Sequence, residues 1–198
     1  MQTEQWLALF FLRSGGTAGT SPVGQTTMTI SALVPPAATC IFAFTMVRAG
    51  LMDLTTYKIR NGLVLFLLLA YAALAPFAGF AGNEIGWSVA VATVVLLFAL
   101  ALFAFGWIGG GDGKLAAVTA LWFGADHTPA YLVFTALFGG ALTLALLQFR
   151  GLTLPALLRD RPWITQLHSG NSGVPMGVAM AVAGLVVFPQ TRWMSAIF

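Results

Sequence analysis

Charged residues and cysteine are both scarce in this sequence. Asp, Glu, Lys and Arg make up 8% of its 198 residues, about a third of the share that is usual in soluble proteins. This scarcity excludes a soluble globular domain and a disordered chain. Cys40 is the only cysteine, so the sequence offers neither an internal disulfide nor a cysteine-based zinc site. We expect no bound metal and no cofactor.

Apolar residues are abundant instead, at 59% of the chain with a mean hydropathy of +0.89. The length accommodates about six transmembrane helices, since each needs ~20 apolar residues. The net charge of +3 comes without a basic run interleaved with aromatic residues, so we expect no nucleic-acid partner. The sequence predicts an all-α, polytopic membrane protein of about six transmembrane helices, surrounded by membrane lipids.

Six apolar stretches without strict alternation mark the expected helical spans. They cover residues 30–52, 62–80, 87–108, 115–125, 129–149 and 174–191. The loops after the first, third and fifth stretch then share one side of the membrane. The basic residues on that side are Arg48, Lys58, Arg60, Lys114, Arg150, Arg159 and Arg161, against Arg13 and Arg192 on the other. The positive-inside rule makes the first side cytoplasmic and places both termini outside.

The first 29 residues fit this scheme poorly. We expect residues 1–29 to be a poorly ordered N-terminal extension and residues 30–198 to be the transmembrane domain that carries the function. Segment 14–27 is rich in Gly, Ser and Thr, which is typical of a loop. Met28 immediately precedes the first span. Two interpretations stay open, translation that starts at Met28 and an extracytoplasmic tail.

Two aspartates fall on the predicted cytoplasmic side. Asp53 closes the first span, and Asp112 lies in the glycine-rich stretch 109–113 between the third and fourth spans. Both can therefore meet at one end of the bundle. Taken singly, Asp53 is also explained as an interfacial residue at a helix end, and the glycine-rich stretch as a flexible connector.

The fourth span is too short to cross a membrane alone. Residues 115–125 rise only ~16 Å, against a hydrocarbon core of ~30 Å. We expect the glycine-rich stretch to be a non-helical turn drawn into the bundle, where irregular backbone is tolerated beside protein or water. Asp112 would then lie below the lipid surface at the head of a short helix.

Two carboxylates in one wet cleft suit the hydrolysis of a peptide bond. Like charges close together do not both ionise easily. The ionised carboxylate can act as general base on a water molecule. The protonated one can polarise the scissile carbonyl and donate to the leaving nitrogen.

The stretch Gly109-Gly110-Gly111-Asp112-Gly113-Lys114-Leu115 resembles the Gly-x-Gly-Asp-x-Lys-Leu motif of prepilin peptidases, which are intramembrane aspartic proteases of the GxGD type. The resemblance covers about residues 32–188 and implies that Asp112 is one catalytic aspartate. It also implies that Gly109, Gly111 and Lys114 belong to the active-site turn.

The second catalytic aspartate of that family is trailed by Ile-Pro-Asn. Here Asp53, Ile59 and Asn61 match this pattern, and Arg60 replaces the proline. The resemblance therefore implies that Asp53 is the other catalytic residue. The change at Arg60 bears on the local turn and not on the aspartate.

Near the end of the chain, Pro175-Met176-Gly177-Val178-Ala179 resembles the Pro-Tyr-Gly-Val-Ala of the family, and we expect Pro175 and Gly177 to serve close helix packing. Larger members carry a cytoplasmic zinc-binding domain and methylate the new N-terminus, for which this sequence has neither the length nor the cysteines. The resemblance implies the short, peptidase-only form of Flp-type pilus systems. That form cleaves leaders from pilin precursors at the cytoplasmic face of the bacterial inner membrane.

Two other hypotheses compete with the peptidase. Intramembrane aspartates also serve proton relays, so the chain could be a proton-coupled transporter or channel. It could also be an assembly subunit whose aspartates only pack helices. A transporter is expected to have broken helices in paired positions, and stretch 109–113 has no counterpart in the other half of the sequence. This asymmetry favours the peptidase.

Overall fold

The computed structural model describes residues 22–152, 162–169 and 173–195, and every regular element in these ranges is helical. In chain order the elements are α2 (Pro22–Thr56), α3 (Asn61–Leu74), α4 (Gly82–Ala104), α5 (Gly110–Gly151), α7 (Pro162–His168), α8 (Met176–Val187), the 3-10 turn η1 (Phe188–Gln190) and α9 (Arg192–Ser195). The all-α prediction is confirmed. Most of the expected extension 1–29 lies outside the described residues, and α2 begins within it, at a proline, which the first helical turn tolerates.

Three described helices are long and apolar enough to cross a membrane, namely Leu33–Thr56 within α2, Gly82–Ala104 and Gly110–Gly151. The apolar helices Asn61–Leu74 and Met176–Gln190 are shorter. Large apolar side chains stay exposed along α4, among them Val94, Leu97 and Phe98. Such a continuous apolar surface is stable against lipid and not against water. The chain is a multi-pass membrane protein.

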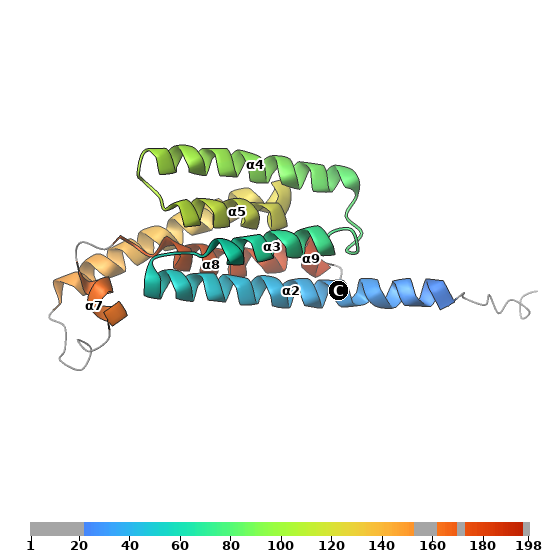
Figure 1. Ribbon diagram of the computed structural model, residues 1–198, viewed down its shortest axis with the longest axis horizontal. Helices are drawn as coiled ribbons and strands as arrows, with labels where there is room; N and C mark the ends of the chain where they lie inside the picture. The colour runs from blue at the N-terminus through green and yellow to red at the C-terminus, as the bar shows by residue number, and fades with distance from the viewer. Residues whose placement is uncertain (1–21, 153–161, 170–172, 196–198) are drawn as a thin grey trace, which may run out of the picture.

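Helix α5 joins two of the expected spans in one element and reverses its direction at Gly124 (Figure 1). Gly124 has φ 64° and ψ −166°, a conformation that is essentially restricted to glycine. The Thr128 hydroxyl donates to the carbonyl oxygens of Gly124 at 2.5 Å and of Ala120 at 3.2 Å. The reversal divides α5 into a first half, residues 110–123, and a second half, residues 125–151.

The expectation that stretch 109–113 is a non-helical turn is wrong. Gly110 is the first residue of α5, Gly109 is its N-cap, and the Gly113 N–H donates to the Gly109 carbonyl at 3.1 Å. Helical hydrogen bonds satisfy backbone groups that an irregular turn inside the bundle would leave without partners. The short helix therefore covers residues 110–123 rather than 115–125.

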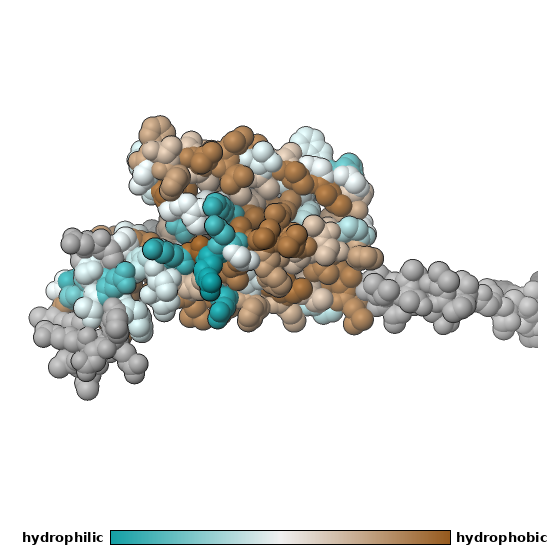
Figure 2. All heavy atoms as spheres, in the orientation of Figure 1, coloured by the Kyte–Doolittle hydropathy of each residue, from teal (hydrophilic) through white to brown (hydrophobic). Residues whose placement is uncertain are grey.

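The helices pack side by side, with α4 against α5, α5 against α8, and α8 against α2. Figure 1 shows α4 and α2 on opposite sides of this bundle, with α3, α5 and α8 between them. Polar side chains gather where α2 ends and α3 begins, and the rest of the visible bundle is mainly apolar (Figure 2). On this face, the polar side chains are therefore concentrated at the end of the bundle where α2 ends and α3 begins.

The opposite end of the bundle is held by a buried aromatic cluster. Trp122 and Trp193 lie with ring centroids 4.8 Å apart, and Tyr71 meets both rings at 5.9 Å. The indole N–H of Trp122 donates to the Leu67 carbonyl at 3.1 Å, and that of Trp193 donates to the Trp122 carbonyl at 2.9 Å. These contacts tie α3, α5 and α9 together, because buried indoles need both apolar packing and an acceptor.

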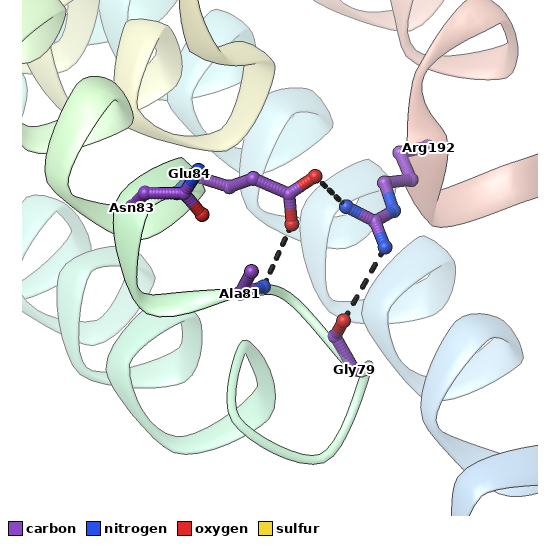
Figure 3. Close-up of polar contacts among 5 residues, drawn as sticks. All are labelled: Gly79, Ala81, Asn83, Glu84 and Arg192. Atoms are coloured by element: carbon purple, nitrogen blue, oxygen red, sulfur yellow. Dashed lines mark hydrogen bonds and ion pairs between the residues drawn. The ribbon is translucent and has the colours of Figure 1, made fainter.

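A polar clamp closes the same end at the surface. The Glu84 carboxylate accepts the Ala81 N–H at 2.7 Å, which caps α4, and also pairs with the Arg192 guanidinium (Figure 3). Arg192 donates to the Gly79 carbonyl at 3.3 Å as well. The clamp joins α9 to the turn between α3 and α4. It lies at the end of the bundle opposite to Asp53, which is near the end of α2.

The reversal at Gly124 generates a stability prediction. Gly124→Ala forces a side chain into a glycine-only conformation and should lower the free energy of unfolding by about 1–3 kcal/mol. Chemical unfolding in detergent micelles measures this difference. Gly86→Ala is the matched control, because Gly86 lies in α4 with nothing within 4 Å of an added Cβ, and it should be neutral or stabilising. Equal stabilities for the two variants would contradict the assigned role of Gly124.

Candidate active site

Asp53 lies one turn before the end of α2 and is buried, with 5% of its surface exposed. Its Oδ2 accepts the backbone N–H of Gly177, in the first turn of α8, at 2.6 Å. A Cβ added at Gly177 would lie 2.8 Å from the Asp53 Cβ, closer than carbon atoms can approach. The start of α8 therefore rests directly on this carboxylate, and a buried charge gains the donor that it needs.

Asp112 lies in the first turn of α5, beside its N-cap. A Cβ added at Gly113 would lie 3.0 Å from the Ala99 Cβ, and one at Gly110 would lie 3.3 Å from the Phe103 ring. Ala99 precedes the end of α4 by five residues, a rise of about 8 Å. The first turn of α5 thus begins alongside α4 and not beyond its end, which places Asp112 inside the bundle.

The two aspartates line one cavity of about 280 Å³, which we call the dyad cavity. Its other lining residues are Tyr57, Lys58, Ile59, Gly109, Gly110 and Gly111. A Cβ at Gly111 would meet the Ile59 Cβ at 3.2 Å and the Ile59 carbonyl oxygen at 3.4 Å. The segment that follows α2 therefore packs on the backbone of the glycine-rich first turn of α5, beside the cavity that both carboxylates line.

The other residues expected at the site surround this cavity. Lys114 donates from Nζ to Oδ1 of Asn61 at 3.1 Å, which joins the starts of α5 and α3 at the surface. Pro175 is buried and forms the N-cap of α8. Gly177 does more than allow close packing, since its N–H binds Asp53. Within the described ranges, no group of three or more His, Cys, Asp or Glu side chains could hold a metal ion.

Sequence reasoning did not assign to the site four residues that line the dyad cavity, namely Tyr57, Lys58, Ile59 and Gly110. Tyr57 has φ 53°, a left-handed conformation that is uncommon for a residue other than glycine. It turns the chain from α2 towards Ile59. A tyrosine carries no sequence signal for that conformation. Ile59 matches the family pattern that follows Asp53, and this match could have placed Ile59 at the site.

The comparisons with known proteins bear on the activity. The model of the type IV leader peptidase family matches residues 40–144, more than half of the chain. The chain belongs to the type IV leader peptidase family. Membership makes it an aspartic-type prepilin peptidase, as the resemblance predicted, and decides against the transporter and assembly hypotheses. No curated protein and no solved structure matched the chain.

The contact between Ile59 and Gly111, in the first turn of α5, can be tested by its effect on peptidase activity. Gly111→Leu has no room for its side chain and should abolish cleavage of a prepilin reporter, although Asp112 is untouched. The matched control is Gly82→Leu, at the start of α4 in the other end of the bundle, where an added Cβ meets nothing within 4 Å. The mobility shift of the reporter is read at equal membrane levels of both variants. Full activity of Gly111→Leu would contradict the close packing of Gly111 against Ile59.

A milder change tests the support of Asp53. Gly177→Ala pushes the Asp53 side chain away from its backbone donor and should lower cleavage by roughly a hundredfold, the order expected from a misplacement of about 1 Å. Gly140→Ala in α5 is the control, because nothing lies within 4 Å of its added Cβ. Initial rates of both variants are compared with that of the unchanged protein. Comparable rates for the two variants would remove Gly177 from the site.

Proposed function

We propose that the chain is a membrane aspartic endopeptidase in which Asp53 and Asp112 form the catalytic dyad. The observation that supports this most directly is the dyad cavity, which both carboxylates line although they lie 59 residues apart in the sequence. Like charges in one cavity favour a state in which a single proton is shared between them. That state is what acid–base hydrolysis of an amide requires.

The hydrolysis would follow from this state. The ionised carboxylate takes a proton from a water molecule, and the resulting hydroxide attacks the carbonyl carbon of the scissile bond. The protonated carboxylic acid polarises the carbonyl oxygen. It then gives its proton to the amide nitrogen as the carbon–nitrogen bond breaks. The dyad ends with its proton moved from one carboxyl group to the other, and later proton exchange restores the starting state.

The substrate we propose is a type IV or Flp-type pilin precursor, cleaved at the cytoplasmic face of the bacterial inner membrane. Family membership supports a prepilin substrate. The excess of basic residues in the loops at the dyad end supports the cytoplasmic orientation of that end. Lys58, Arg60 and Lys114 are exposed there.

We also propose six membrane passes. The reversal at Gly124 supplies two of them from α5, and α2 and α4 supply one each. The shorter α3 and the Met176–Gln190 helix would supply the remaining two. A short apolar helix is accommodated in a membrane by local thinning of the bilayer or by its flanking residues.

The dyad is tested by replacing each carboxyl group with an amide. Asp53→Asn and Asp112→Asn should each abolish cleavage of a co-expressed prepilin, because each loses a proton-transferring group at nearly unchanged shape. Asp126→Asn is the control, since Asp126 is exposed and lines a different cavity beside Arg192. It should cleave at the unchanged rate. Processing retained in either dyad variant, at normal membrane levels, would remove that residue from the dyad.

A further inference from the structure

Three buried hydroxyl groups lie together between the two halves of α5, and we call their residues the hydroxyl cluster. Thr119 belongs to the first half, and Tyr131 and Thr135 belong to the second half. The Tyr131 hydroxyl is within polar contact range of both threonine hydroxyls. None of the three has a hydrogen bond of good geometry among the residues that the structure describes. Thr119 and Tyr131 are completely buried, with 0% of their surface exposed.

The reversal at Gly124 explains why these residues meet. Residues on the two halves lie side by side when they are about equally far from the reversal. Thr119 precedes Gly124 by five residues and Tyr131 follows it by seven, which are rises of about 8 and 10 Å. Tyr131 and Thr135 lie four residues apart, so they share one face of the second half. The spacing therefore brings the three hydroxyls to one region between the halves.

The hydroxyl cluster lies close to Asp112. Asp112 precedes Gly124 by 12 residues and Thr135 follows Gly124 by 11, so the two lie at about the same level of the bundle. Both also line one cavity of about 300 Å³ between α4, α5 and α8. Thr119 follows Asp112 by seven residues, which places both on the same side of the first half. The Asp112 carboxylate is within electrostatic range of the Tyr131 hydroxyl. The cluster therefore adjoins the half of α5 that carries Asp112.

Hydroxyl groups at this depth need a partner. Buried polar groups in proteins nearly always have a hydrogen bond, either to protein or to an ordered water molecule. In a membrane protein, bulk solvent does not supply that partner. An apolar occupant would leave all three hydroxyls unpaired, and a metal ion would find no charged ligand among them. A buried water molecule typically makes about three hydrogen bonds, which matches three hydroxyls in one place.

We propose that the hydroxyl cluster binds an internal water molecule between the two halves of α5, and that this water holds the first half in the position that Asp112 needs for catalysis. The inference rests on the proposed role of Asp112 in the dyad. The three residues of the cluster are then positioning residues, because they act through Asp112. Thr128 joins the two halves at the reversal by donating to the Ala120 carbonyl. The water adds a second joint, nearer to the dyad cavity.

Two replacements of Thr119 separate this role from simple packing. Thr119→Val keeps the shape of the side chain and removes the hydroxyl, whereas Thr119→Ser keeps the hydroxyl and removes a methyl group. We expect Thr119→Val to lower kcat by about tenfold with KM less affected, because a small displacement of a catalytic group is costly, and Thr119→Ser to stay within about twofold of the unchanged protein. Thr45→Val is the control and should leave kcat unchanged, because the equally buried Thr45 hydroxyl donates to the Ile41 carbonyl within α2. A larger loss in Thr119→Ser than in Thr119→Val would overturn the inference.

The water itself can be detected without any substitution. Threonine methyl groups are labelled with carbon-13 in the full chain in detergent micelles, and nuclear Overhauser transfer from water protons is measured. We expect transfer to the methyl groups of Thr119 and Thr135. Thr45 is again the control, because its buried hydroxyl has a protein partner, so transfer that a threonine hydroxyl relays by proton exchange would appear there as well. Transfer to Thr119 and Thr135 no stronger than to Thr45 would overturn the water site, and is the result expected if the hydroxyls bond one another directly.

The two measurements separate a failure of this inference from a failure of the dyad. The water signal is recorded on the unchanged protein and does not depend on the chemistry of cleavage. If Asp112→Asn still cleaves the precursor while the water signal is present, the dyad is wrong and the water site stands. If Asp112→Asn is inactive and Thr119→Val cleaves at the unchanged rate, the dyad stands and the positioning role is overturned.

Discussion

The close approach of α8 to the end of α2 is the constraint on which the site depends. Asp53 is buried, and the Gly177 N–H at 2.6 Å is its backbone donor. That donor reaches the carboxylate only because residue 177 has no Cβ. This polar contact helps to fix the register of α8 against α2, and Pro175, the N-cap of α8, lies two residues before Gly177.

Small residues fix the other helix contacts in the same way. Gly113 meets Ala99 between α5 and α4, and Gly50 meets Ala181 between α2 and α8, with an added Cβ at 3.0 and 3.1 Å respectively. Helices in lipid gain no hydrophobic free energy by associating, so they depend on close packing through small residues. The glycines thus position the aspartates in two ways. They bring the helices together, and they leave a backbone N–H within reach of the Asp53 carboxylate.

The sequence predicted where the two aspartates meet better than it predicted the local backbone. The count of basic loop residues and the alternation of apolar stretches placed Asp53 and Asp112 at one end of the bundle. Both patterns extend over many positions of the sequence, so they do not depend on any single residue. The helical state of stretch 109–113 could not be read in this way. Four glycines in five residues favour a turn by local preference, but burial alongside Ala99 and Phe103 makes intrahelical hydrogen bonds worth more than that preference. The donor role of Gly177 was likewise invisible, since it depends on a contact across 124 residues.

The position of Asp112 supports the role in hydrolysis that we propose for it. The first turn of α5 begins against Phe103, one residue before the end of α4, and at Gly113 it lies against Ala99, about 8 Å from that end. The dyad cavity, at the polar end of the bundle, offers space for water beside both carboxylates. Gly111 and Gly113 let the first turn of α5 lie this close to Ile59 and to Ala99 of α4, so these two glycines set the depth of Asp112 in the bundle.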